Sequence, residues 1–78
     1  MERNDMCDAI ETYAKRKGFP NIRCFIMTVD GAKEYAICDD KEWLYGSQSA
    51  ESIAVHIDML KLAEKQTRLH KNLLEKAQ

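Results

Sequence analysis

Apolar residues recur every three to four positions between residues 5 and 17, which is the period of an amphipathic α-helix. Asn4 or Asp5 can cap its first turn, and the segment "GFP" at 18–20 provides a left-handed glycine and a proline that end it. The pattern predicts a helix over this range. Its expected buried face consists of Met6, Ile10, Tyr13 and Ala14.

Two runs of β-branched, aromatic and apolar residues follow, at 22–29 and 32–38. The dipeptide Asp30-Gly31 between them favours a two-residue hairpin turn, since both turn positions need positive φ. The turn predicts that Val29 pairs with Ala32, Ile26 with Tyr35 and Cys24 with Ile37. Both faces are apolar, so we expect helices on one side and a partner or a long helix on the other. The segment "EWLY" at 42–45 is a candidate short third strand.

A last helix is expected from Ser47 or Ser49 to the C-terminus, without a residue that would break it. Nearly thirty residues give roughly 42 Å of helix, whereas a compact globule of this length is roughly 30 Å across. Residues 53–63 are apolar nearly all round, so we expect that half to lie inside a core. The fold class is therefore α+β, in the order helix, three-stranded antiparallel meander, long helix. We expect one domain, 1–78, with a body at 1–63 and a candidate assembly arm at 64–78.

Positions along this helix alternate steps of four and three residues, the spacing of a helix–helix contact. We call this series the stripe; it consists of Val55, Met59, Leu62, Gln66, Leu69 and Leu73. Two interpretations remain open, because two heptads fall short of the three or four that identify a coiled coil. In the first, the part of the stripe from Met59 to Leu73 joins two copies as a homodimer through the C-terminal helix. In the second, the first helix of the same chain covers the stripe. Parallel and antiparallel pairing are both open.

The composition is that of an ordinary folded domain, with 78 residues, 45% hydrophobic and 32% charged, and a net charge of −1. The N-terminus is charged where a signal peptide needs an apolar run, and no apolar stretch approaches the ~20 residues of a membrane span. We expect a cytoplasmic protein without a membrane partner. Cys7, Cys24 and Cys38 lack the close pairing of a zinc site, so we expect reduced thiols and no metal or cofactor.

No catalytic motif is present, and a chain of this size rarely encloses a substrate pocket alone, so we expect no enzyme. The middle of the chain is acidic and carries aromatics, a combination that suits contact with a protein partner. The candidate partner-binding residues are Asp39, Asp40, Glu42, Trp43 and Tyr45. We expect a non-enzymatic protein–protein interaction module, a small regulator or inhibitor. In size and acidic character it is similar to inhibitors from phages and mobile elements that act on host defence enzymes, such as anti-CRISPR proteins.

Nucleic-acid binding is the alternative function. The expected element order is similar to that of double-stranded-RNA-binding domains, which place a basic cluster at the start of their second helix. Here that position reads "SQSAES" and holds an acid but no lysine. The basic residues instead lie further along the helix, interrupted by Glu64 and Glu75; they are Lys61, Lys65, Arg68, Lys71 and Lys76.

Overall fold

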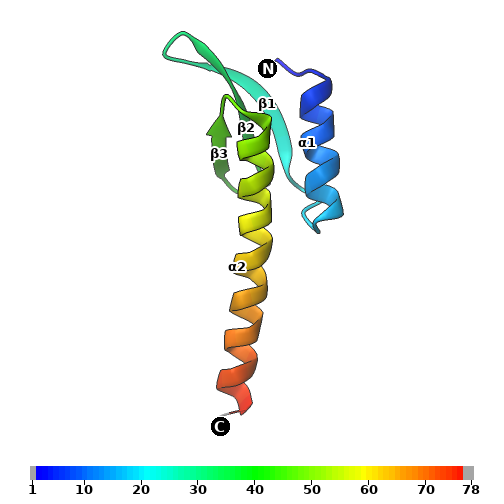
Figure 1. Ribbon diagram of the computed structural model, residues 1–78, viewed down its shortest axis with the longest axis vertical. Helices are drawn as coiled ribbons and strands as arrows, with labels where there is room; N and C mark the ends of the chain where they lie inside the picture. Colours follow the sequence, from blue (N-terminus) through cyan, green and yellow to red (C-terminus); the bar gives the residue numbers. More distant parts are fainter. Residues whose placement is uncertain (1, 77–78) are drawn as a thin grey trace.

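The computed structural model describes residues 2–76 and contains two helices and three strands (Figure 1). In chain order these are α1 (Asp5–Arg16), β1 (Arg23–Val29), β2 (Ala32–Cys38), β3 (Trp43–Ser47) and α2 (Ala50–Lys76). The predicted α+β fold and its element order are confirmed. Residues 77–78 of the predicted arm lie outside the described residues.

Helix α1 begins and ends as the sequence predicts. The Asn4 side chain accepts a hydrogen bond from the Cys7 N–H, at 3.1 Å, and caps the first turn. At the other end Gly18 has φ +97°, and the N–H of Phe19 donates to the Ala14 carbonyl at 2.9 Å. The Gly18 N–H donates to the Lys15 carbonyl at 3.0 Å, so the two bonds form a Schellman motif.

The buried face of α1 differs from the prediction by one position. Cys7, Ile10 and Ala14 are buried, whereas Met6 is 43% exposed and Tyr13 is only partly buried. Cys7 is three residues before Ile10 and seven before Ala14, so these three side chains share one side of the helix. The smaller Cys7, and not Met6, faces the core.

The β1–β2 hairpin has the predicted register. Val29 pairs with Ala32, Ile26 with Tyr35 and Cys24 with Ile37. The two turn residues both have positive φ, 50° at Asp30 and 80° at Gly31. This geometry matches the right-handed twist of the strands and fixes which side chains share each face.

Strand β3 pairs antiparallel with β2 and extends two residues beyond the predicted end, to Ser47. Its register is irregular: Tyr45 pairs with Ile37, whereas Trp43 pairs with Cys38. Leu44 is therefore an extra residue between two consecutive pairs, a β-bulge. The bulge turns Trp43 and Tyr45 to opposite faces of the sheet.

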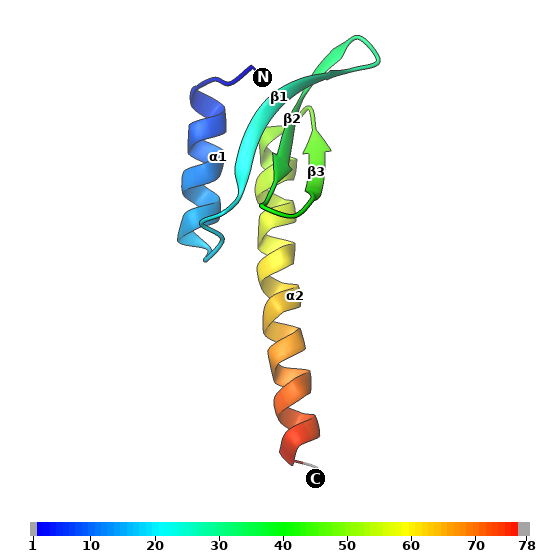
Figure 2. The same ribbon diagram turned by 180° about the vertical axis from the view of Figure 1, so that it is seen from behind.

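Both helices pack on the same face of the sheet (Figures 1 and 2). In Figure 1 the first turns of α2 lie in front of β2, with β3 beside them, and in Figure 2 β2 lies in front of α2. The core between these layers includes Cys24 and Ile37 from the sheet and Ile53 and Ile57 from α2. The other sheet face was expected to be covered by a partner or a long helix, and within residues 2–76 neither α1 nor α2 covers it. Met27 and Trp43 on that face are 43% and 60% exposed.

Helix α2 outreaches the rest of the chain. The Ser49 hydroxyl accepts a hydrogen bond from the Ser52 N–H at 3.4 Å, which identifies Ser49 as the cap. The helix runs for 27 residues, and the structure measures 53 × 25 × 22 Å. The radius of gyration is 15.0 Å, whereas a compact chain of this length would have about 11–12 Å.

The expectation that residues 53–63 lie inside a core is wrong. Ile53 and Ile57 are fully buried, but Met59 is 61% exposed. A single α-helix packed on one sheet buries only one side, so the remaining apolar positions of this segment face solvent.

The N-terminal segment lies along the outer edge of β1. The Ile26 N–H donates to the Glu2 carbonyl at 2.8 Å, and the Lys33 ammonium pairs with the Glu2 carboxylate at 3.0 Å. Arg3 also donates to the Cys24 carbonyl at 2.8 Å. These contacts give hydrogen-bond partners to backbone groups on the edge of β1 that has no neighbouring strand.

Candidate protein-binding surfaces

The stripe on α2 lies on the surface of the chain. Leu62, Leu69 and Leu73 are 56%, 61% and 59% exposed, and Gln66 between them is exposed as well. The buried Ile53 and Ile57 come from the other side of the helix. At about 100° per residue, the centre of the stripe is roughly 180° from the centre of the buried side. One helix therefore presents an apolar side to its own core and a second apolar side to solvent.

Helix α1 does not cover the stripe, so the within-chain alternative is wrong. The two helices meet on the flank of α2 that carries Asp58, whose carboxylate accepts a hydrogen bond from the Tyr13 hydroxyl at 2.6 Å. The Lys17 ammonium lies 3.4 Å from the same carboxylate. The Tyr13 hydrogen bond, with the charge of Lys17, lowers the pKa of Asp58. These contacts hold α1 to one side and leave Val55 56% exposed.

The stripe continues from the body onto the protruding part of α2, residues 64–76, which we call the arm. In the arm, Leu69 and Leu73 keep the spacing set by Met59 and Leu62. From Val55 to Leu73 the stripe is about 27 Å long at 1.5 Å per residue. A continuous apolar line of this length along an exposed helix is typical of helix–helix recognition.

The basic residues of α2 are partly engaged within the helix. The Glu64 carboxylate accepts a hydrogen bond from Arg68 at 2.8 Å and lies 3.8 Å from the Lys61 ammonium. The Lys61 ammonium also lies 3.3 Å from the position that a Cβ on Gly18 would occupy. Two of the five basic residues thus have an acidic partner, which weakens the helix as a phosphate-binding surface.

The acidic β2–β3 loop is stabilised from within by Asp39. Its carboxylate accepts hydrogen bonds from the N–H groups of Lys41 and Glu42, at 2.8 and 2.9 Å, and these bonds lower its pKa. The Asp39 N–H donates to the Glu42 carbonyl at 3.0 Å. Asp39 therefore shapes the turn, and Asp40 and Glu42 are the loop acids left facing solvent.

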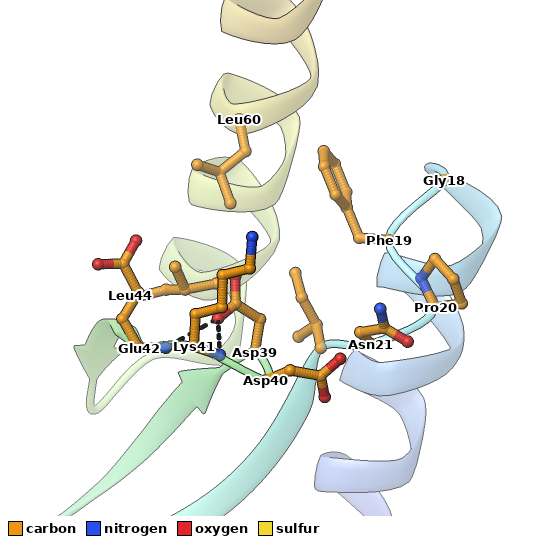
Figure 3. A pocket seen from close by; sticks show the side chains of 11 residues that line it. Gly18, Phe19, Pro20, Asn21, Asp39, Asp40, Lys41, Glu42, Leu44 and Leu60 are labelled. Atoms are coloured by element: carbon orange, nitrogen blue, oxygen red, sulfur yellow. Dashed lines mark hydrogen bonds between the residues drawn. The ribbon is translucent and has the colours of Figure 1, made fainter.

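This loop forms one wall of an open pocket of about 450 Å³ (Figure 3). The opposite wall is the chain that follows α1, from Gly18 to Asn21, and Leu60 of α2 lies above the pocket. Apolar side chains and acidic side chains both line it. The apolar ones are Phe19, Ile22, Leu44 and Leu60, and the acidic ones are Asp39, Asp40 and Glu42. Lys41 lines it as well, so the pocket is apolar on one side and mixed in charge on the other.

The five predicted partner-binding residues do not form one surface. Asp39, Asp40, Glu42 and Trp43 lie together at the β2–β3 turn, but the bulge places Tyr45 on the helix-covered face. There Tyr45 is partly buried and stacks on His56, with ring centroids 4.3 Å apart and planes 5° from parallel. Trp43 lies on the open face, where a Cβ on Gly46 would meet its ring at 3.1 Å.

Four aromatic residues of the sheet could stack on nucleic-acid bases only if they lay on one face, and they are divided in the same way. Phe25 shares the open face with Trp43, whereas Tyr35 and Tyr45 face the helices. A continuous stacking surface of the kind that binds single strands is therefore not formed by these four residues.

A polar network at the N-terminus escaped the sequence reasoning. The Arg3 guanidinium donates to the Glu11 carboxylate at 2.5 Å and to Asp8 at 2.6 Å, while the Cys24 N–H donates to Glu11 at 2.8 Å. The hydrogen bond from Arg3 lowers the pKa of Glu11, and the Cys24 N–H acts in the same direction. The network ties α1 to the edge of β1. The spacing of Asp8 and Glu11 was the available signal, but it equally fits acids at a helix N-terminus.

The cysteines are free thiols. Cys24 pairs with Ile37 and Cys38 with Arg23, so the two thiols point to opposite faces of the sheet. Burial raises the pKa of the Cys24 thiol to about 12, and the neighbouring Cys7 adds to the shift, so this thiol stays protonated. Among residues 2–76 there is no group of three or more side chains suited to hold a metal ion.

No family model, no curated protein and no solved structure matches this chain. Within the described range, neither helix combines the length and apolar character needed to cross a membrane.

Proposed function

We propose that the chain is a non-enzymatic protein–protein interaction module that assembles as a homodimer through α2. The observation that carries this proposal is the stripe, which is exposed along its whole length on the side of α2 opposite the body. A line of five apolar side chains that are each more than half exposed is unusual for a monomeric domain. Exposure of apolar surface to water is unfavourable, and contact with a second surface removes that cost. A second copy of the same helix offers the matching spacing.

The second part of the proposal concerns the target of the dimer. Each copy presents the β2–β3 turn, where Trp43 is exposed next to Asp40 and Glu42 at the rim of the pocket. An aromatic side chain flanked by acids suits a basic partner surface with an exposed apolar group. We propose that this turn contacts a protein partner and that the chain is a small regulator or inhibitor. A nucleic-acid-binding site on a host defence enzyme, the expected target of a phage or mobile-element inhibitor, would have this basic character.

The decisive experiment is sedimentation equilibrium on the full chain and on a version that ends at Lys65. All side chains of the core precede Lys65, so the shorter version keeps them, and circular dichroism checks that it folds. We expect a dimer for the full chain and a folded monomer for the short one. A full chain that stays monomeric at the highest soluble concentration would overturn the proposal.

Nucleic-acid binding through the basic residues of α2 is the less favoured function. Glu64 engages Lys61 and Arg68, and the candidate stacking aromatics are divided between two faces. A titration with RNA and DNA duplexes at two salt concentrations separates the functions. Affinity that falls steeply with salt would support nucleic-acid binding, and the absence of binding at low salt would remove it.

A further inference from the structure

The two halves of the stripe lie in different surroundings. The half with Val55, Met59 and Leu62 belongs to the part of α2 that is anchored by Ile53 and Ile57 in the core. The other half, with Leu69 and Leu73, lies on the arm. The arm extends past the end of the sheet (Figure 1), so the orientation of a second copy decides which surface stabilises the arm.

Charge differs between the halves in the same way. Residues 1–63 carry eight Lys and Arg against eleven Asp and Glu, a net charge of −3. Residues 64–78 carry four Lys and Arg against two Glu, a net charge of +2. A parallel pair would place arm beside arm and body beside body, like charge against like charge. An antiparallel pair would place each positive arm beside a negative body.

The positions that continue the stripe favour the same orientation. Three residues before Val55 lies Ser52, and three residues after Leu73 lies Lys76. In a parallel pair Lys76 would meet Lys76 of the second copy at the end of the contact. In an antiparallel pair it would lie level with Ser52 of the second copy, one residue from the exposed Glu51.

We propose, as a consequence that rests on the homodimer proposed above, that two copies of α2 pair antiparallel with their centre near Glu64. This register places Val55 level with Leu73 of the second copy, Met59 with Leu69, and Leu62 with Gln66. Each arm then docks on the anchored half of the other α2, and all five apolar side chains of the stripe are covered in both copies. A parallel pair would cover the same side chains, but it would place each arm only against the other arm, where like charges meet.

Gln66 is the feature that most favours a parallel pair, because two facing amides could hydrogen-bond to each other. In the antiparallel register Gln66 faces Leu62 instead. Its long side chain can turn its amide to the rim of the contact, where water satisfies it. The hydrogen bonds of one amide pair would therefore favour the parallel orientation less than the charge distribution and the position of Lys76 favour the antiparallel one.

The orientation can be measured with spin labels on the full chain by pulsed electron paramagnetic resonance. The labels are attached to Lys65→Cys and, separately, to Asn72→Cys, each in a Cys38→Ala background. Lys65 and Asn72 are seven residues apart, are both exposed, and occupy the same side of α2 beside the stripe. Cys7 and Cys24 are fully buried, so they are shielded from the label.

In the proposed register the two labels at position 65 are offset along the helix by about 3 Å, and those at position 72 by about 24 Å. We therefore expect a clearly longer label–label distance at position 72 than at position 65. Equal distances at the two positions would overturn the antiparallel pair and leave a parallel dimer. If neither position gives a dipolar signal, the homodimer itself fails, so the two proposals fail in different ways.

Discussion

A single leucine substitution on the arm tests whether the stripe is the contact surface. Leu69 is 61% exposed in the single chain, and full burial of a leucine is worth about 1.5–3 kcal/mol. Covering the exposed part would then contribute about 0.9–1.8 kcal/mol per copy, or about 1.8–3.7 kcal/mol for the two copies in a dimer. Leu69→Gln should therefore raise the dimer dissociation constant roughly 20- to 400-fold.

Leu74→Gln is the matched control. Leu74 is also a leucine of the arm and is 55% exposed, but it lies about 100° around the helix from Leu73 and outside the stripe. Glutamine is a good helix former in both places, so the helix should persist. We expect a change of less than about threefold in the dissociation constant for this variant, since it removes no contact across the pair.

Sedimentation equilibrium over a range of chain concentrations gives both dissociation constants, and circular dichroism gives the helix content of each variant. The assignment of the stripe as the contact surface is refuted if the two substitutions weaken the dimer equally, because the contact would then be unspecific. It is also refuted if Leu69→Gln leaves the dissociation constant unchanged while the wild-type chain dimerises.

Three further predictions concern the body. Gly18→Ala should lower the free energy of unfolding in urea by about 1–2 kcal/mol, because alanine is strained at φ +97°; an unchanged midpoint would show that the turn relaxes. Glu11→Gln should flatten the dependence of stability on pH. The pKa of Glu11 in the folded chain lies below its ordinary value of 4.5, so its contribution is present above that pH and is lost as the pH falls; parallel pH profiles for wild type and variant would contradict this. Gly46→Ala should displace the Trp43 ring, which lies 3.1 Å from the position of the new Cβ, and shift its fluorescence emission; an unshifted spectrum would mean that the strand moves instead.

The parts of the fold fixed by short-range chemistry could be predicted from the sequence. The Asp30-Gly31 turn sets the hairpin register, and the residues after α1 form their Schellman motif from neighbours in the chain. Each depends on backbone conformations that few residue types adopt, so the sequence signal is strong.

Features that depend on tertiary packing could not be predicted in the same way. The helical period alone does not say which of two adjacent residues, Met6 or Cys7, faces the core. An apolar residue on α2 such as Met59 looks the same whether another layer covers it or not. The bulge at Leu44 separates Trp43 from Tyr45, which a regular strand would have placed on one face.

The segment before α1 has a consequence for the behaviour of the chain at high concentration. An uncovered edge strand is a template on which a second chain can add its own strand and begin to aggregate. Glu2 occupies that template beside Ile26, and Lys33 holds its carboxylate. Loss of the first few residues, or a bulky fusion joined there, would expose the β1 edge and favour uncontrolled sheet growth.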